Sequence, residues 1–531
     1  MSVPTLVSRL VSARYFKWIW HNGKTILTLL SLPILSGVST VRQRLWCAQH
    51  GRGINETQGS PNAFHHLLPI VSRRKSNNPC LVLHDQTSNM TNKVGTSTQQ
   101  HLHTGAEHGH LSIEALKAHE FEKAYRAHSS VFEDSFYKVP PGSAEAPAGA
   151  LLKVEREVDP NLYNIPPNHA ISRFMYQSQK SDGSLVPVTA YILWPYIART
   201  HRQGHPVVAW AHGTSGVNPE SAPSNMKNLW HDFQVVYQVT LNGYVIVATD
   251  YAGLGLERDG LDNEIVHEYM TGPAQGNDVI FSVKAARVAF PELSEDFVII
   301  GDSEGGQAAW AAAERLYKEP LPTHLGTIAI SPLTRLLSLP ETGWAIPLLV
   351  MMLVPALQQR FHDFGPEDVL TPKGVQILQT YRALNGCNTL LFQLPCAHDT
   401  LRSDWQTNPH IQEYQKTAFT GGKQIRGPLL VMHGDSDSIV TMKSVTEAVH
   451  ATAEVCPAVH IAYHVLPNVS HVPGMFAGQP IWMDWIAARF AREPLEPGLF
   501  NHVAKPIRPE STQLKEANWY IQNKTESWQS R

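Results

Sequence analysis

Residues 297–316, FVIIGDSEGGQAAWAAAERL, contain the feature of this chain that decides its fold. Apolar residues run into the hexapeptide GDSEGG at 301–306, and an alanine-rich stretch follows directly. This order predicts a buried strand, a strained tight turn carrying Ser303, and a helix. Gly301 and Gly305 leave room for neighbouring backbone close to the turn, where side chains would clash. Ser303 would then lie at the carboxyl end of a sheet, where open α/β folds bind ligands.

Apolar strands alternate with helices on both sides of this turn. We expect strands at 207–210, 245–249, 298–300, 327–330, 429–432 and 461–466, and helices at 277–290, 307–316, 443–455 and 481–492. Two earlier strands, 171–177 and 185–193, flank a hairpin turn at 182–183. Continuous apolar strands joined by crossover helices predict an α/β fold, with a mostly parallel sheet and helices on both faces.

An amphipathic helix is expected where the ordered part of the chain begins, at 112–128. Its cap is Ser112, and its apolar residues lie partly on one side: Ile113, Leu116, Phe121 and Ala124.

The changing composition divides the chain into six segments. We expect a basic and apolar targeting segment at 1–53, a disordered polar linker at 54–110, the first part of the α/β core at 111–330, a helical cap insertion at 331–426, the second part of the core at 427–495 and a polar tail at 496–531. Within the insertion, residues 344–357 are apolar all round but too short to span a bilayer. This pattern predicts a buried helix of the cap, and an inner wall that could receive an acyl chain or another hydrophobic group.

The first 53 residues contain no Asp or Glu, and basic residues precede an apolar run at 25–41. The run is shorter than the about 20 residues of a membrane span, and it suits the core of a secretory signal peptide. A mitochondrial transit peptide and a membrane anchor through 25–41 are the alternatives. We favour entry into the secretory pathway and secretion, which would expose the glycosylation sequons at Asn55, Asn89, Asn468 and Asn523.

Charge and cysteine content exclude several classes of function. The 531 residues carry a formal net charge of -3, which gives no case for nucleic-acid binding. Five cysteines are too few for a disulfide scaffold, and the absence of a Cys-x-x-Cys pair argues against a thiolate zinc site. Cys387 and Cys396 are close enough in sequence to form a disulfide, and free buried thiols are the alternative. The pairing of Cys456 is open.

A serine nucleophile needs a base that takes its proton and an acid that orients the base. After a strand-turn-helix of this kind, the chain order is serine, acid, histidine. The acid candidates are Asp437 and Asp435, which follow the strand at 429–432. We favour Asp437, because it lies one turn past the strand and precedes an apolar anchor. His471, in a loop after the strand at 461–466, is the candidate base.

Acyl transfer also needs N–H donors for an oxyanion. One is the backbone amide of Glu304, which follows the serine, and a second should come from an earlier loop at a strand end. The run VVAWAHGTSG at 207–216 supplies such a loop, so we nominate the amide of Thr214, helped by that of Gly213. His212 is interpreted as a structural residue that holds this turn through its ring nitrogens.

Several of these stretches together resemble the secretory lipase family of α/β-hydrolases, which has fungal and bacterial members. The resemblance spans roughly residues 130–490, and its stretches are DSFY at 134–137 with PP at 140–141, VVAWAHGTSG at 207–216, DYAGLG at 250–255, the serine turn, GDSDSIV at 434–440 and the loop of His471. It implies the α/β-hydrolase fold, an inserted helical cap, and a Ser-Asp-His esterase without metal or organic cofactor. These roles carry over to Ser303, Asp437 and His471.

Two positions depart from the pattern of that family. Glu304 stands where Gln or Gly is usual, and Asp302 stands where His or Tyr is common. The Glu304 side chain either faces solvent in the first helical turn, where it suits the helix dipole, or faces the substrate and selects among acyl groups. Both charges bear on the choice of substrate.

The combined expectation is a hydrolase of carboxylic esters that acts on a hydrophobic small molecule through an acyl-enzyme on Ser303. Contact between the cap and a lipid surface is part of this expectation. A biosynthetic hydrolase or acyltransferase would use the same residues on an ester, lactone or thioester. A serine peptidase is disfavoured, because the N-terminal part shows no β-propeller repeats. A non-catalytic binding protein usually loses one of the three residues, and here all three positions are filled. Acyl length and oligomeric state stay open.

Overall fold

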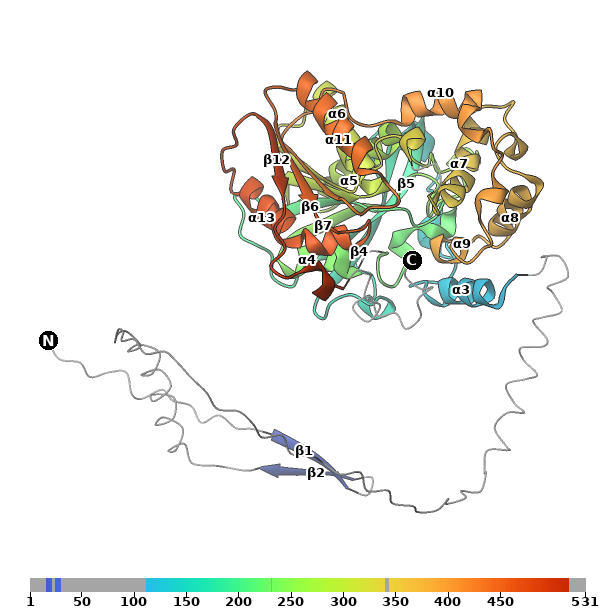
Figure 1. Ribbon diagram of the computed structural model, residues 1–531. Helices are drawn as coiled ribbons and strands as arrows, with labels where there is room; N and C mark the ends of the chain where they lie inside the picture. Colours follow the sequence, from blue (N-terminus) through green and yellow to red (C-terminus); the bar gives the residue numbers. More distant parts are fainter. Residues whose placement is uncertain (1–15, 22–23, 30–110, 231, 340–342, 515–531) are drawn as a thin grey trace, which may run out of the picture. The chain divides into compact units, whose positions relative to one another are not determined.

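The computed structural model describes residues 16–21, 24–29, 111–230, 232–339 and 343–514 (Figure 1). The chain divides into two compact units, Met1–Asn89 and Met90–Arg531. In the first unit, strands β1 (Phe16–His21) and β2 (Lys24–Leu29) pair antiparallel. Several predicted features lie outside the described residues: the linker at 54–110, the apolar run beyond residue 29, the tail beyond residue 514, and the sequons at Asn55, Asn89 and Asn523. None of the helices in the described ranges is long and apolar enough to cross a membrane.

A ten-stranded sheet forms the centre of the second unit, in the order β12-β11-β10-β9-β8-β6-β7-β5-β4-β3. Neighbouring strands run parallel from β12 to β7, and β5, β4 and β3 continue the sheet antiparallel. The strands are β3 (Leu151–Glu155), β4 (Ala170–Gln179), β5 (Leu185–Trp194), β6 (His205–Ala211), β7 (Val245–Thr249), β8 (Leu293–Asp302), β9 (His324–Ile330), β10 (Leu429–Gly434), β11 (His460–Leu466) and β12 (Gly498–Val503).

Helices connect the parallel strands, and one further helix, α3 (Ile113–Ala124), precedes the first strand of the sheet. The connecting helices are α4 (Val236–Leu241), α5 (Gly272–Ala289), α6 (Glu304–Lys318), α11 (Met442–Val455), α12 (Pro473–Ala477) and α13 (Gln479–Phe490), with α7 to α10 between β9 and β10. Short 3-10 turns occupy several of the remaining connections.

Each face of the sheet has its own apolar core, because successive residues of a strand point to opposite faces. Val207 and Ile299 pack in a cluster with residues of α5 and α6. Val208 and Ile300, one position further along, pack in a second cluster with residues of α4 and α13. Burial on both faces explains why these strands read as continuous apolar runs. The predicted α/β fold, with a mostly parallel sheet and helices on both faces, is confirmed.

The described part of the segment between β9 and β10 consists of helices, short 3-10 turns and loops. It holds α7 (Ile346–Arg360), α8 (Pro372–Ala383), α9 (Asn388–Leu391) and α10 (Pro409–Ala418), which gather beside the sheet (Figure 1). Helix α7 corresponds to the apolar run at 344–357, and its apolar residues are buried on nearly every side. The interpretation of residues 331–426 as a cap over the site stays a prediction.

The sheet extends past the predicted end of the core. Strand β12 pairs with β11 at residues inside the segment 496–531, which the composition predicts to be a polar tail. Its residues are half-buried or exposed at the sheet edge, so Asn501 and His502 occupy positions where an apolar signal is missing. Strand β3, at the opposite edge, is not among the predicted strands either; its residues LLKVE are all half-buried. Because β12 comes after β11 in the chain, the loop of His471 follows the second-last strand of the sheet.

Helix α3 presents a different face to the protein from the one that its apolar residues predict. Its cap is Ser112, as expected, with the Ala115 amide donating to Ser112 Oγ (3.1 Å). Ile113 is 67% exposed, however, while Glu122 is buried. The Glu122 carboxylate accepts the backbone N–H groups of Cys387 (2.9 Å) and Leu390 (2.7 Å) at the start of α9. These polar bonds, rather than apolar periodicity, fix the orientation of α3.

The three cysteines in the described ranges, Cys387, Cys396 and Cys456, carry free thiols. Cys387 Sγ donates to the carbonyl of Glu220 (3.4 Å). Of the two alternatives for Cys387 and Cys396, free thiols therefore hold.

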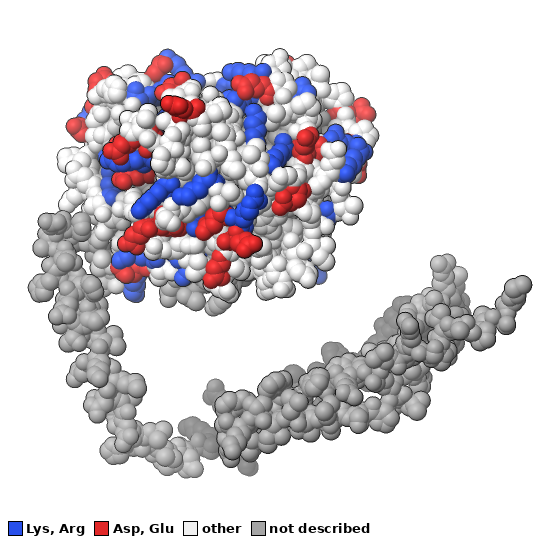
Figure 2. Space-filling view, turned by 180° about the vertical axis from the view of Figure 1, so that it is seen from behind, with Lys and Arg blue, Asp and Glu red and all other residues white. Residues whose placement is uncertain are grey.

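Charged side chains of both signs are intermixed on the face shown in Figure 2. Lys and Arg lie beside Asp and Glu there, so on this face the described residues make no extended field of one sign.

Candidate active site

Ser303 occupies the turn between β8 and α6. Its backbone has φ 58° and ψ -117°, a combination that residues other than glycine rarely adopt. The Ser303 N–H donates to the carbonyl of Ile330 in β9 (2.9 Å), and the Ser303 carbonyl accepts from Gln307 (3.1 Å) and Leu333 (3.3 Å). These bonds hold the strained turn from both sides. The hydroxyl is therefore presented at the carboxyl end of the sheet on a rigid support.

The two glycines of the turn sit against backbone. A Cβ on Gly301 would lie 2.0 Å from the carbonyl oxygen of Gly305, and a Cβ on Gly305 would lie 1.9 Å from that of Ala211. Both separations are far shorter than any real contact. The start of α6 can approach the end of β6 only because these two positions lack a side chain.

A chain of hydrogen bonds joins Ser303 to His471 and Asp437. His471 Nε2 lies 2.9 Å from Ser303 Oγ, and His471 Nδ1 lies 2.6 Å from Asp437 Oδ2. The other carboxylate oxygen, Asp437 Oδ1, accepts the backbone N–H groups of Ile439 (2.9 Å) and Val440 (3.0 Å). The Asp437 side chain is fully buried and His471 is 7% exposed. This arrangement can remove a proton from the serine and stabilise the resulting imidazolium.

Electrostatics keep Asp437 ionised beside His471. Burial raises the pKa of Asp437, but the charge of His471 and its hydrogen bond outweigh burial and hold that pKa below its ordinary value. Burial lowers the pKa of His471, while the Asp437 charge, the Asp437 hydrogen bond and the Asp302 charge raise it to about 9. His471 is thus a strong base in this environment.

Asp435, the second candidate for the acid, lies on the exposed side of the same turn. Its Oδ1 accepts the backbone N–H of Asn468 (2.6 Å) and the hydroxyl of Ser436 (3.1 Å). Asp437, and not Asp435, is therefore the carboxylate that contacts His471. His433, which the sequence reading does not single out, lies 3.8 Å from Asp437 Oδ2 and is also fully buried.

The loop after β6 adjoins the serine turn, since a Cβ on Gly305 would also meet the carbonyl of His212 at 2.6 Å. This loop carries the nominated donors Gly213 and Thr214. His212 Nδ1 lies 2.8 Å from the carbonyl of Gly213, and burial lowers the pKa of His212 to about 4. The Trp230 indole N–H also donates to the Gly213 carbonyl (3.0 Å). The rings of His212 and Trp230 thus hold the loop by bonding to the Gly213 carbonyl, and His212 does so in its neutral form.

The acids that flank Ser303 are both buried. Glu304 is 2% exposed, so of the two alternatives for its side chain the solvent-facing one is wrong. Its Oε1 accepts from His267 Nε2 (2.9 Å) and from the side-chain amide of Gln275. Asp302 Oδ1 has no hydrogen-bond partner among the described residues, and burial raises the pKa of Asp302 to about 7. His267 and Gln275 are not predictable from the sequence, because neither belongs to a catalytic motif.

The surroundings of the serine turn are apolar on the side of the helical insertion. Val217, Tyr269 and Leu333 belong to the same buried cluster as the apolar residues of α7. Leu333 is also hydrogen-bonded to the Ser303 carbonyl. The apolar core of the insertion thus reaches the residues beside the nucleophile.

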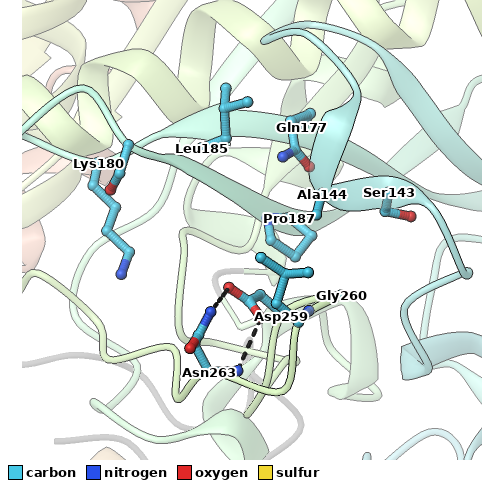
Figure 3. A pocket seen from close by; sticks show the side chains of 11 residues that line it. Ser143, Ala144, Gln177, Lys180, Leu185, Pro187, Asp259, Gly260 and Asn263 are labelled. Carbon is cyan, nitrogen blue, oxygen red and sulfur yellow. Dashed lines mark hydrogen bonds between the residues drawn. The ribbon is translucent and has the colours of Figure 1, made fainter.

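A surface pocket of about 430 Å³ lies between the β4–β5 hairpin and the loop at 259–263, and Ser303, Asp437 and His471 are not among its lining residues (Figure 3). The Asp259 carboxylate in this pocket accepts both N–H groups of Asn263, its backbone amide and its side chain. The lining residues are Ser143, Ala144, Gln177, Lys180, Ser184, Leu185, Pro187, Asp259, Gly260, Leu261 and Asn263. The pocket is separate from the Ser303 site.

No group of three or more His, Cys, Asp or Glu side chains within the described ranges could hold a metal ion.

Comparison with known proteins gives matches of structure only. No protein-family model matches the chain, and no curated protein matches its sequence. Candida antarctica lipase A in its closed state matches with a TM-score of 0.55 and 14% identity, over 71% of this chain and 91% of that one. The rice cell wall degrading esterase LipA from Xanthomonas oryzae matches with a TM-score of 0.51 and 17% identity, over 65% of this chain and 98% of that one. At this identity the likeness shows the fold, which is the α/β-hydrolase fold of lipases and esterases, as the sequence predicts.

Proposed function

We propose that this chain with an α/β-hydrolase fold is a serine hydrolase that cleaves carboxylic esters of hydrophobic small molecules. The observation that carries the proposal is the hydrogen-bonded chain from Ser303 through His471 to Asp437 at a strained strand-to-helix turn. The arrangement has the geometry by which a histidine base activates a serine hydroxyl.

In the first half of the reaction, Ser303 Oγ attacks the ester carbonyl carbon while His471 Nε2 takes the hydroxyl proton. Asp437 holds His471 by its Nδ1–H and stabilises the positive charge. The backbone amides of Glu304 and Thr214, with help from Gly213, donate to the oxyanion. The carbon–oxygen bond to the alcohol then breaks, His471 returns its proton to the leaving alkoxide, and the acyl group stays on Ser303.

In the second half, water replaces the alcohol. His471 takes a proton from the water, the resulting hydroxide attacks the acyl carbon, and the second oxyanion forms at the same donors. Collapse of this intermediate breaks the bond to Ser303 Oγ, which recovers its proton from His471. The products are a carboxylic acid and an alcohol, so the reaction balances without a metal or an organic cofactor.

The apolar cluster beside the turn supports a hydrophobic acyl group as the substrate. Val217, Tyr269 and Leu333 join the residues next to Ser303 to the buried core of α7. We infer that residues 331–426 act as a cap whose inner wall contacts the acyl chain, and that the cap is the surface that meets a lipid. Burial of an acyl chain in such a wall would contribute about 0.8 kcal/mol for each methylene group.

The N-terminal segment supports a proposal about location. Residues 1–53 lack acidic residues and contain the apolar run at 25–41, which suits entry into the secretory pathway. Expression in a eukaryotic host and N-terminal sequencing of the protein in the medium would test it. Retention in mitochondria or in membranes contradicts secretion.

The test of function is an activity profile of the purified full chain on p-nitrophenyl esters of increasing acyl length, with Ser303→Ala beside the wild type. We expect Ser303→Ala to lose activity and labelling by a fluorophosphonate probe together. Ser184→Ala, an exposed serine on the β4–β5 hairpin, is the matched control and should keep both. Full turnover by Ser303→Ala overturns the proposed mechanism. A wild-type chain that neither labels nor turns over any ester would instead be a binding protein.

A further inference from the structure

The side chain that follows the nucleophile belongs to a buried, hydrogen-bonded pair of titratable residues. Glu304 Oε1 lies 2.9 Å from His267 Nε2, and both side chains are 2% exposed. The side-chain amide of Gln275, in α5, donates to the same oxygen. A buried carboxylate is expensive unless it is paired and hydrogen-bonded, and here both conditions are met.

Both ring nitrogens of His267 have hydrogen-bond partners. His267 Nδ1 lies 2.9 Å from the carbonyl of Ala252, which can only accept, so Nδ1 carries a proton. His267 Nε2 is hydrogen-bonded to Glu304 Oε1, the oxygen that also accepts from Gln275. Burial lowers the pKa of His267, but the hydrogen bond and charge of Glu304 outweigh burial and raise it. His267 is therefore held to the first residue of α6 by a buried hydrogen bond.

Two residues further along, the same segment holds the other side of the oxyanion site. Tyr269 is completely buried, and its hydroxyl lies 3.0 Å from Thr214 Oγ1. His267 thus fixes Glu304, and Tyr269 fixes Thr214. These are the two residues whose backbone amides are the main proposed oxyanion donors, and they lie on separate elements, α6 and the loop after β6.

The segment that joins them is itself rigid and is tied to the helical insertion. A Cβ on Gly253 would lie 2.3 Å from the backbone nitrogen of His267, so the neighbouring loop is packed tightly against it. The Tyr414 hydroxyl, in α10, donates to the carbonyl of Tyr269 (2.7 Å). The same hydroxyl lies 2.6 Å from Thr271 Oγ1, which can donate to it. One short stretch therefore contacts α6, the loop of Thr214 and α10.

We propose that His267 and Tyr269 are positioning residues, which together set the spacing of the Glu304 and Thr214 amides and link that spacing to the helical insertion through Tyr414. The proposal rests on the proposed function, because it assigns these residues to the oxyanion step of that reaction. Oxyanion donors act only when they are held in the right place before the charge develops. The hydroxyl of Tyr269 on one side of the gap and the ring of His267 on the other, both on one segment, provide that support.

Tyr269→Phe tests the proposal with the loss of a single oxygen. We expect kcat to fall about 10- to 100-fold with KM changed less than about 2-fold, since the donors matter chiefly in the transition state. A trifluoromethyl ketone forms a tetrahedral adduct on the serine. Its inhibition constant should rise by the same factor by which kcat/KM falls. A substitution that only loosens the fold would not produce this proportionality.

A matched control is present in the same chain. The Tyr463 hydroxyl lies 3.0 Å from Thr446 Oγ1, the same separation as in the Tyr269–Thr214 pair, but on β11 and α11. Tyr463→Phe should leave kcat and the affinity of the ketone unchanged. Thr214→Val keeps the backbone amide and removes the hydroxyl, so Tyr269→Phe should have no further effect on kcat in that background.

Each outcome decides between the inference and the proposed function. If the wild type shows no turnover that depends on Ser303, the proposed function fails. If that turnover is present and Tyr269→Phe keeps kcat and ketone affinity within about 2-fold of the wild type, the inference is overturned and the function stands. Where Tyr269→Phe does not fold, Thr214→Val breaks the same bond from the other partner, and full kcat in that variant overturns the inference. Glu304→Gln extends the test to the His267 side, where kcat should fall with little change in KM.

Discussion

Asp302 and His471 interact through their charges although Asp302 Oδ1 has no hydrogen-bond partner among the described residues. Asp302 directly precedes Ser303 and ends β8, which places a second buried carboxyl group in the electrostatic environment of the histidine. Burial lowers the pKa of His471, but the Asp437 and Asp302 carboxylates raise it to about 9. One of them orients the ring by a hydrogen bond, and the other acts only through its charge.

Asp302→Asn should move the acid limb of the pH profile of kcat/KM to lower pH. His471 acts as a base only when it is neutral, so activity rises as the pH passes through its pKa. Removal of the Asp302 charge removes one cause that raises this pKa, and the pKa falls. The measurement is kcat/KM from pH 5 to 10 on a short ester. An unmoved or higher acid limb would contradict the prediction, provided that the variant has the melting temperature of the wild type.

Asp437→Asn and Asp435→Asn should differ sharply in activity. Asp437→Asn loses the acceptor that fixes the tautomer of His471, so kcat should fall by about 10³- to 10⁴-fold. The Asp435 carboxylate accepts from Asn468 and Ser436 at the surface of the turn, so Asp435→Asn should keep kcat within about 3-fold, because surface substitutions are nearly neutral. Initial rates on one ester decide the matter. Equal losses in the two variants would refute the assignment of the acid.

Gly305→Ala should destabilise the protein by about 3 kcal/mol or more, because its Cβ would penetrate the backbone of β6. Gly474→Ala, in α12, is the control, since a Cβ there would have its nearest neighbour at an ordinary 3.5 Å. That variant should change the stability by less than about 1 kcal/mol. Urea denaturation of the two variants compares them. Similar stabilities for both would show that the start of α6 can move away from β6.

Glu122→Gln should reduce the pH dependence of stability. Burial raises the pKa of Glu122 to about 7 despite the two backbone N–H groups that its carboxylate accepts. Between its ordinary pKa of 4.5 and about 7, the folded protein binds more protons at this site than the unfolded chain does. Its contribution to the free energy of unfolding therefore falls as the pH rises through this window. We expect the wild type to lose stability relative to Glu122→Gln between pH 5 and pH 8 in urea titrations. A difference that stays constant, or that grows in favour of the wild type, would be the contrary result.

The central strands are predictable from sequence because both of their faces are buried. Val207 and Val208 pack on opposite sides of the sheet, so no position in β6 is free to be polar. The edge strand β12 lacks this constraint, and its Asn501 and His502 read as a tail. The face of α3 is unpredictable for a related reason, because a buried carboxylate on α3 fixes it by bonding to backbone groups more than 260 residues away in the chain.

The three residues joined by hydrogen bonds at Ser303 are predictable because each lies in a local pattern at the end of a strand. Their order along the chain and their turn chemistry suffice to nominate them. The Glu304–His267 pair has no such pattern, because the two residues are 37 positions apart and neither marks a motif. In a sequence, a glutamate and a histidine are expected at the surface. Only the packing of α6, α5 and the segment of His267 shows that the two residues are buried together.

The crowding at Gly301 and Gly305 has an evolutionary consequence. Any side chain at either position would clash with neighbouring backbone, so we expect no other amino acid to replace these glycines. The conformation of the turn that carries Ser303 is thereby fixed. Under the proposed function, adaptation to new esters must then come from substitutions outside this turn. The helical insertion is a separate run of sequence between β9 and β10, so it can change without altering these two glycines. Divergence in substrate among descendants of this chain should therefore accumulate in residues 331–426, while the turn that carries Ser303 stays constant.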